Sequence, residues 1–377
     1  MRDIVIGIPT KNEECTIIHV LNTVTAGLLD FFPEYDASIL VADGNSTDRT
    51  IRLAESFRTP PQIEKIVMRK SGETGKGGAI RDIMRVASDI KANMLAIVDS
   101  DLISITPSWM DHLLRPIAFG IADFTTPRYI RDKHDGGVTK LLTYPMITTL
   151  FGDEIRQPMG GEVGLSSELI RCCLDHPLFP DDWGIDTFIT FVALANGLRI
   201  QEAPLGPKFH ESTSKYVKPS THLLPMFEEV VITLFRMMEH YESVWKKHTL
   251  TRVGGARKFD RCKGPSPTPA IIDAKIFRST AEERIKKHRR MLGEMVEEKP
   301  DARVSMEEWP EIVFRFASEY KRSKDENIIK LLGGLWLVRY ADFVEETRDM
   351  GLNDAEKVVH NQMLSFLEKR DLLVEIY

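Results

Sequence analysis

Apolar segments typical of β-strands alternate with helical patterns over residues 1–219. Such alternation favours an α/β fold with a mostly parallel sheet and helices on both faces. The amphipathic patterns between the strand segments predict the covering helices. The expected strands are residues 4–9, 38–42, 62–68, 95–98, 122–128, 163–165 and 199–203.

The pattern changes near Pro219, after which nearly every segment predicts helix. We therefore expect an α/β domain at 1–219 and an all-helical domain at 220–377, interrupted by a basic, Pro/Gly-rich connector at 252–269. Leu331, Leu335 and Val338 have helical spacing and predict core or a subunit interface, so a homodimer or higher homo-oligomer is expected. The expected helices are 223–240, 281–297, 306–323, 327–347 and 354–376.

The stretch LAIVDSD, from Leu95 to Asp101, links the fold to chemistry. Its apolar part predicts a strand buried on both faces. Asp99 and Asp101 follow at once, and unpaired carboxylates are too costly to bury in a core. Ligands of open α/β sheets bind beyond the carboxyl ends of such strands, where two acids suit a hard divalent cation. A solvated turn is the alternative for this tripeptide.

Composition restricts the function classes. The chain has 377 residues, 42% hydrophobic and 28% charged, as in ordinary soluble proteins, and its net charge of -6 argues against a general nucleic-acid binder. Its four cysteines fit neither a zinc site nor a disulfide framework, which predicts reduced thiols in a cytoplasmic protein. No signal peptide or transmembrane segment is expected.

Two polar segments follow the first two predicted strands. In TKNEE, Asn12 and Glu13 can hold a nucleotide, or the acids simply begin a helix. In DGNSTD, Asp43 can meet a base or ribose, or make an Asx turn. Both alternatives stay open at this point.

Four further residues are candidates for charge chemistry. Lys76 in GKGGA sits at a predicted helix N-terminus, which suits a phosphate, although a solvated lysine explains it as well. His210 is a possible imidazole ligand or an ordinary loop histidine. Asp186 is a candidate site acid or a helix cap, and Arg131 can bind an anionic acceptor or be a surface charge.

Taken in order, VIGIPTKNEE, VADGNSTDRT, GKGGA and VDSD resemble the nucleotide-binding half of GT-A-fold glycosyltransferases. QPMGGE, DDWGIDT and KFHES narrow the resemblance to retaining enzymes of compatible-solute synthesis, the mannosylglycerate synthases and glucosyl-3-phosphoglycerate synthases. The match covers about residues 3–216. The long helical tail suits the first family, whereas DSD and RYIRDKHDGGVTKLL favour the second.

The resemblance implies roles by position. Asp101 and His210 would ligate Mg²⁺ or Mn²⁺, with Asp99 at the metal or ribose. Arg131 and Thr139 would hold the carboxylate or phosphate of the acceptor, with Asp135 beside them. The implied nucleotide-sugar contacts are Pro9, Thr10, Asn12, Glu13, Asp43, Lys76, Asp99, Ser100, Gly160, Gly161, Glu162 and Asp186. The implied catalytic residues are Asp186, Lys76 and Arg131.

The expected reaction moves mannose or glucose from GDP-mannose, GDP-glucose or UDP-glucose to glycerate or 3-phosphoglycerate. Retention is expected through front-face attack, with Asp186 orienting the sugar rather than forming a covalent adduct. The alternatives are a GT-A enzyme acting on a polyprenyl phosphate or polysaccharide, a sugar-1-phosphate nucleotidyltransferase, and an inactive scaffold. TKNEE argues against the nucleotidyltransferase, and the acids of DSD argue against the scaffold.

Overall fold

The structure, a computed structural model, describes residues 3–69, 75–209, 218–248, 270, 272–292 and 303–377. Contacts between Cα atoms divide the described chain into two units. The α/β unit comprises residues 3–131 and 157–209, and the helical unit comprises 132–156 and the described residues from 218 onward. The predicted boundary at Pro219 stays a prediction, because the contacts group 132–156 with the later helices.

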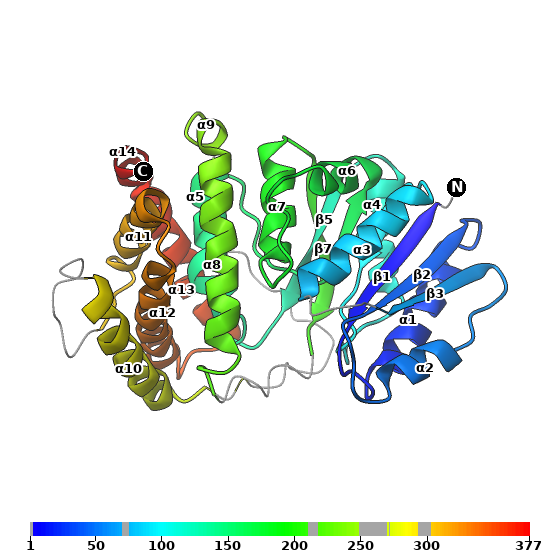
Figure 1. The fold of residues 1–377 in the computed structure, drawn as a ribbon, viewed down its shortest axis with the longest axis horizontal. Coiled ribbons are helices and arrows are strands. Elements are labelled where there is room, and N and C mark those ends of the chain that lie inside the picture. The colour runs from blue at the N-terminus through cyan, green and yellow to red at the C-terminus, as the bar shows by residue number, and fades with distance from the viewer. Residues whose placement is uncertain (1–2, 70–74, 210–217, 249–269, 271, 293–302) are drawn as a thin grey trace. The chain divides into compact units, whose positions relative to one another are not determined.

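A mostly parallel sheet forms the centre of the α/β unit, as predicted (Figure 1). In the described residues it has seven strands in the order β3-β2-β1-β4-β6-β5-β7. Strand β6 runs antiparallel to β4 and to β5, and the other pairs are parallel. The strands are β1 (Ile4–Thr10), β2 (Ala37–Asp43), β3 (Ile63–Arg69), β4 (Met94–Ile97), β5 (Phe124–Ile130), β6 (Val163–Ser166) and β7 (Ile200–Pro207).

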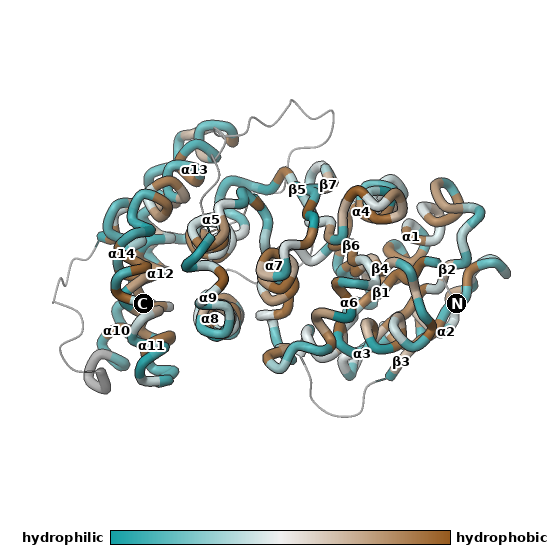
Figure 2. The backbone as a smooth tube through the Cα atoms, turned by 90° about the horizontal axis from the view of Figure 1, so that it is seen from above, coloured by the Kyte–Doolittle hydropathy of each residue, from teal (hydrophilic) through white to brown (hydrophobic). Residues whose placement is uncertain are grey.

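Helices cover both faces of this sheet, and Figure 2 shows α1 and α4 on one side of the strands and α3 and α6 on the other. Ile4, Ile6 and Ile8 of β1 are buried in the core shared with α1 and α4. Alternate residues of a strand face opposite sides, so every β1 residue is buried between two helical layers. The helices of this unit are α1 (Ile17–Phe31), α2 (Thr50–Ser56), α3 (Lys76–Asp89), α4 (Ser108–Ala118), α6 (Ser167–Leu174) and α7 (Ile185–Ala195).

The helical unit is built around α12, which is buried from Ile328 to Val344 at most positions. Leu331, Leu335 and Val338 are among these residues, so they build core within this chain. The described helices are the π-helical turn η1 (Thr139–Thr143), α5 (Tyr144–Phe151), α8 (Leu223–His240), α9 (Glu242–Trp245), α10 (Ala274–Leu292), α11 (Trp309–Ser323), α12 (Glu326–Glu346), α13 (Leu352–Glu368) and α14 (Arg370–Ile376).

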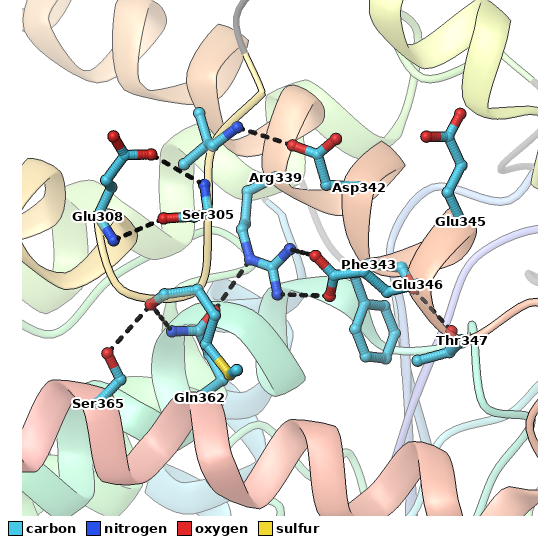
Figure 3. A network of polar contacts seen from close by, with 12 residues as sticks. Ser305, Glu308, Arg339, Asp342, Phe343, Glu345, Glu346, Thr347, Gln362 and Ser365 are labelled. Atoms are coloured by element: carbon cyan, nitrogen blue, oxygen red, sulfur yellow. Dashed lines mark hydrogen bonds and ion pairs between the residues drawn. The ribbon is translucent and has the colours of Figure 1, made fainter.

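A buried arginine fixes α12 to its neighbours in this unit (Figure 3). Arg339 is fully buried, and its guanidinium donates to both carboxylate oxygens of Glu346 and to Gln362 Oε1. Gln362 in turn donates to the backbone carbonyl of Met306. An arginine has five N–H donors, so it can hydrogen-bond to two partners at once, which an apolar side chain cannot do.

Two helix predictions for this region are wrong in their bounds. The helix expected from residue 281 begins at Ala274, because the Asp273 side chain accepts the N–H of Lys275 at its start. The single helix expected over 354–376 is two helices that meet at Lys369, where the backbone leaves the regular helical conformation. None of the described helices is long and apolar enough to cross a bilayer.

Candidate functional site

The carboxyl ends of β1, β2 and β4 meet at one edge of the sheet. Parallel pairing sets Thr10 opposite Asp43, and the N–H of Val98 donates to the carbonyl of Gly7. Ser100 and Pro9 are both predicted to contact the nucleotide sugar. In the structure, Ser100 Oγ donates a hydrogen bond to the carbonyl of Pro9 at 2.9 Å, which fixes the end of β4 to the end of β1. The DSD segment therefore lies at the edge where ligands of α/β sheets bind.

Five charged side chains form a continuous chain beyond this edge, in the order Asp186, Lys76, Asp99, Lys208 and Glu162; Asp99 is 22% exposed and the other four are 9% exposed or less. Lys76 Nζ lies 3.1 Å from Asp186 Oδ2 and 3.0 Å from Asp99 Oδ1. Lys208 Nζ lies 2.9 Å from Glu162 Oε2 and 3.9 Å from Asp99 Oδ2. Asp99 is thus held between two ammonium groups. We call these five residues the charged chain.

Each member of the charged chain comes from the end of a different element. Lys76 begins α3, Asp186 is in the first turn of α7, and Asp99 follows β4. Glu162 precedes β6 and Lys208 follows β7. An acid in the first turn of a helix is stabilised by the helix dipole, which explains the position of Asp186.

The members set the protonation of one another. Burial would lower the pKa of Lys76, but Asp186 and Asp99 outweigh it and hold this pKa above its ordinary value. Burial would raise the pKa of Asp99, but Lys76 and Lys208 hold it below its ordinary value. At neutral pH, Asp99 is therefore a carboxylate between charged lysines.

The two outer acids of the charged chain differ from Asp99. Burial raises the pKa of Asp186 above its ordinary value and the pKa of Glu162 to about 7. Glu162 is fully buried, so its carboxylate holds Lys208, and its predicted contact with the donor sugar stays a prediction. Gly161 lies so close to the carboxylate of Asp99 that a Cβ there would collide with it, whereas Gly160 packs on Pro127.

The N-terminus of α3 does not offer its amides to a phosphate, contrary to the expectation from GKGGA. The N–H groups of Gly77 and Gly78 donate to the backbone carbonyls of Asp182 and Asp181. These bonds dock α3 on the loop before α7 and bring Lys76 to Asp186. Trp183 in this loop is 47% exposed, and Lys76 Nζ lies 5.6 Å from the centre of its ring.

The predicted nucleoside contacts lie at the ends of β1 and β2 and on the loops that follow, and hydrogen bonds join these two loops. Asn12 has a left-handed backbone conformation, and its Oδ1 accepts the N–H of Thr47 at 2.7 Å. Asp43 accepts the N–H of Ser46, three residues further along the chain, so its carboxylate makes a local backbone contact. Thr10 is buried, and no residue in the described chain hydrogen-bonds its hydroxyl. The Glu13 N–H donates to Thr50 Oγ1, which fixes the start of α1 to α2.

The predicted metal ligands can be compared only in part. His210 lies outside the described residues, and in the described chain no three His, Cys, Asp or Glu side chains form a metal-binding group. Phe209, which precedes His210, accepts the N–H of Ile103 and donates its own N–H to Ser104 Oγ. The chain that leads to His210 therefore pairs with the residues directly after Asp101.

The predicted acceptor residues lie in both units. Arg131 is the last residue of the first segment of the α/β unit, and Asp135 and Thr139 belong to the helical unit, where both are buried. Lys133 lies two residues after Arg131, and its Nζ donates to the backbone carbonyls of Thr347, Arg348 and Met350. An ammonium has three donors, so it has none left for an acid.

Lys208 is the residue that the sequence prediction missed. It is 6% exposed, and its Nζ lies 4.8 Å from the ring centre of Tyr129. The signal in the sequence is its place in KFHES, two residues before His210, since alternate residues of an extended segment share a face. Glu162 as its partner is not readable from the sequence, because β6 and β7 come to lie on the two sides of β5 only in the folded sheet.

Comparison with known proteins identifies the class of this site. Residues 5–164 match the family described as "Glycosyl transferase family 2". The chain is 28% identical over 258 residues to glucosyl-3-phosphoglycerate synthase of Mycolicibacterium smegmatis, covering 62% of this chain and 77% of that protein. It is 27% identical over 235 residues to glycosyltransferase AglJ of Haloferax volcanii, covering 60% of this chain and 68% of that protein.

A solved structure shows the same fold with ligands bound. Glucosyl-3-phosphoglycerate synthase from Mycobacterium tuberculosis, in complex with Mn²⁺, uridine diphosphate and phosphoglyceric acid, superimposes with a TM-score of 0.51 at 25% identity. The match covers 63% of this chain and 78% of that one. The protein is therefore a glycosyltransferase of the GT-A fold that resembles glucosyl-3-phosphoglycerate synthase, and its residues 5–164 are similar to glycosyl transferase family 2.

Proposed function

We propose that this glycosyltransferase moves a hexose from a nucleoside diphosphate sugar to 3-phosphoglycerate or D-glycerate, with retention and with Mg²⁺ or Mn²⁺. The observation that carries the proposal is the pairing of Ile103 with Phe209, because Phe209 directly precedes His210 in sequence and Ile103 lies two residues after Asp101. Relatives named for phosphoglycerate, one of them with Mn²⁺ and uridine diphosphate bound, support the choice of acceptor and donor class.

The residues at the sheet edge fit a divalent cation. Asp101 and His210 would supply the oxygen and nitrogen ligands that Mn²⁺ and Mg²⁺ accept. Asp99 is flanked by two ammonium groups, so we assign it to orienting Lys76 and Lys208 rather than to direct ligation. When bound, the cation would stabilise negative charge on the departing diphosphate.

Residues of the charged chain would also act on the negative charge that develops on the departing diphosphate. In the proposed reaction the bond from the anomeric carbon to the diphosphate breaks, a bond to the acceptor oxygen forms, and the acceptor proton passes to the diphosphate. Lys76 is fixed between Asp99 and Asp186, so its positive charge is in place before the diphosphate leaves. Asp186 would orient the sugar hydroxyls. Its raised pKa and its pairing with Lys76 do not favour a covalent nucleophile.

A donor-by-acceptor activity matrix tests the proposal. Purified protein with Mn²⁺ or Mg²⁺ is assayed with GDP-mannose, GDP-glucose and UDP-glucose against 3-phosphoglycerate, D-glycerate, lactate and a polyprenyl phosphate. We expect metal-dependent transfer to one of the first two acids, with the anomeric configuration of the donor retained. Transfer to the polyprenyl phosphate alone would contradict the proposal.

Two further measurements test residue roles. Arg131→Ala should raise the KM for the acid acceptor more than the KM for the donor, because Arg131 is proposed to bind the anion. An unchanged acceptor KM would remove Arg131 from that role. Mass spectrometry of a trapped intermediate tests Asp186, and a covalent glycosyl group on its carboxylate would rule out front-face attack.

A further inference from the structure

Residues 132–139, here called the acceptor loop, are held by more hydrogen bonds than their sequence suggests. DKHDGGVT contains charges and adjacent glycines, a composition typical of an adaptable surface loop. Instead, the buried Lys140 donates from Nζ to the carbonyls of Asp132 and Lys133, both at 2.8 Å. The Asp135 N–H also donates to the carbonyl of Asp132. The start of the acceptor loop is therefore closed on itself.

Lys133 attaches the acceptor loop to the C-terminus of α12. Its Nζ lies 2.8 Å from the carbonyl oxygen of Thr347, 2.6 Å from that of Arg348 and 2.9 Å from that of Met350. Thr347 is the C-cap of α12, and Arg348 and Met350 lie in the turn that follows it, so the three carbonyls are close to a helix C-terminus, which attracts a cation. Every ammonium proton of Lys133 therefore fixes backbone, and the loop position is tied to the end of α12.

One stripe of α12 receives the rest of the acceptor loop. Tyr340, Phe343 and Thr347 have the i, i+3, i+7 spacing of one helix face. The Tyr340 hydroxyl donates to the carbonyl of His134, and Gly137 lies so close to the Tyr340 ring that any side chain there would collide with it.

The ring of His134 completes this contact. Its Nε2 lies 3.0 Å from Thr347 Oγ1, and its ring meets Phe343 edge to face, with centroids 6.2 Å apart. The hydroxyl of Thr347 donates to the carbonyl of Phe343, as Figure 3 shows, so His134 Nε2 carries the proton in its bond to Thr347.

We propose that α12 is the positioning element for acid binding: Lys133, His134 and Tyr340 hold the acceptor loop in one conformation, so that Thr139 meets a small carboxylate or phosphate without a further ordering cost. This inference rests on the proposed function, because it takes Thr139 as an acceptor contact. It gives the helical unit a role in substrate affinity, and Lys133 and Tyr340 act through the loop without touching the acid.

Steady-state kinetics of Lys133→Met and Tyr340→Phe test the inference, with 3-phosphoglycerate and D-glycerate as acceptors. We expect the acceptor KM to rise about tenfold for Lys133→Met, the size expected for losing hydrogen bonds from a charged group, and less for Tyr340→Phe. The donor KM and kcat should stay within about twofold, because neither side chain contacts the donor. Calorimetric titration with 3-phosphoglycerate should show the same weakening.

Matched controls come from the helical unit itself. Lys321→Met removes another lysine that donates to a backbone carbonyl, that of Tyr377, and Tyr320→Phe removes another buried tyrosine hydroxyl. Both controls should keep the wild-type acceptor KM even if they lower the melting temperature.

The outcomes separate the two proposals. If the wild-type protein transfers hexose to either acid but Lys133→Met and Tyr340→Phe keep its acceptor KM, the positioning role is wrong and the proposed function stands. An equal rise in acceptor KM for the control variants would also overturn the positioning role. If the wild-type protein uses neither acid with any donor, the proposed function fails and the inference fails with it.

Discussion

The two lysines of the charged chain, in the α/β unit, face carboxylates, whereas Lys133 and Lys140, in the helical unit, face backbone carbonyls. Lys76 and Lys208 share Asp99 between them, and each also pairs with a second buried acid. Lys133 and Lys140 instead saturate their donors on carbonyl oxygens of turns and helix ends. A ligand can replace a carboxylate as partner of a lysine, but a lysine bound to carbonyls is already fixed as structure.

This difference in partners distinguishes charged groups that are candidates for function from those that are candidates for stability. Groups whose pKa values are shifted by one another at the edge of a sheet are candidates for chemistry. Buried charges that satisfy the backbone, or that pair as Arg156 does with Glu356, are candidates for stability. Substitutions in the charged chain should therefore change kcat. Substitutions of charges that satisfy the backbone or pair with each other should change stability, and Lys133 adds an effect on the acceptor KM through the loop that it holds.

The largest expected effect is at the edge of the α/β unit. Asp101→Ala or His210→Ala should lower kcat by about 100-fold or more, if the cation contributes about 3 kcal/mol to the transition state. Turnover at saturating donor, acceptor and Mn²⁺ is the measurement. Near-normal turnover in either variant would remove that residue from the metal site.

Lys208→Met should affect both stability and activity. It leaves the fully buried carboxylate of Glu162 without its ammonium, so the free energy of unfolding should fall by about 3 kcal/mol in urea denaturation. Adding Glu162→Gln removes the stranded charge and should restore part of that loss. A double variant less stable than Lys208→Met would contradict the assignment of Glu162 to holding Lys208.

Arg156→Met is the matching change in the helical unit. Arg156 donates to both carboxylate oxygens of Glu356, and its guanidinium lies 5.1 Å from the ring centre of Tyr144. Breaking this buried pair should lower the free energy of unfolding by about 3 kcal/mol. Measured well below the melting temperature, kcat and both KM values should match those of the wild type. A loss of kcat in Arg156→Met without a loss of stability would contradict the assignment of this pair to stability.

The smallest effect is the titration of His134. Burial lowers its pKa to about 4, with Lys133 and Lys140 acting in the same direction and Asp132 against it. Between pH 6.5 and about 4 the unfolded chain binds a proton that the folded chain does not, so stability falls as pH falls through this window. The stability of wild type relative to His134→Gln should therefore decrease from pH 7 to pH 5. A constant difference would contradict the lowered pKa.

The fold and three of the five residues of the charged chain could be predicted because they depend on local pattern, and a fourth, Glu162, is implied by the family resemblance. Asp99 follows a continuous apolar strand, and Asp186 and Lys76 begin helices. The partners of these residues could not be predicted. Lys76 meets Asp186 across 110 positions of sequence, and Lys133 meets Thr347 across 214. Such pairings depend on how whole elements pack, which leaves no local signature.

The part of the GKGGA prediction that needs free backbone amides is wrong for the same reason, and the role of Lys76 as a donor contact stays a prediction. A helix N-terminus after a glycine suits a phosphate only when its amides are available. Here the carbonyls of Asp181 and Asp182 occupy the amides of Gly78 and Gly77, through contacts distant in sequence. The lysine within the motif keeps its place in the site, because the docked loop delivers Asp186 to it.

The central claim is that a divalent cation binds beside Asp101 at the end of β4. Titration of Mn²⁺ followed by electron paramagnetic resonance, in the presence of uridine diphosphate, tests it directly. The wild-type protein and the control Asp89→Asn, an exposed acid on α3, should bind Mn²⁺ saturably, and Asp101→Asn should bind it at least about tenfold more weakly. Equal Mn²⁺ affinity in Asp101→Asn and wild type would contradict the account.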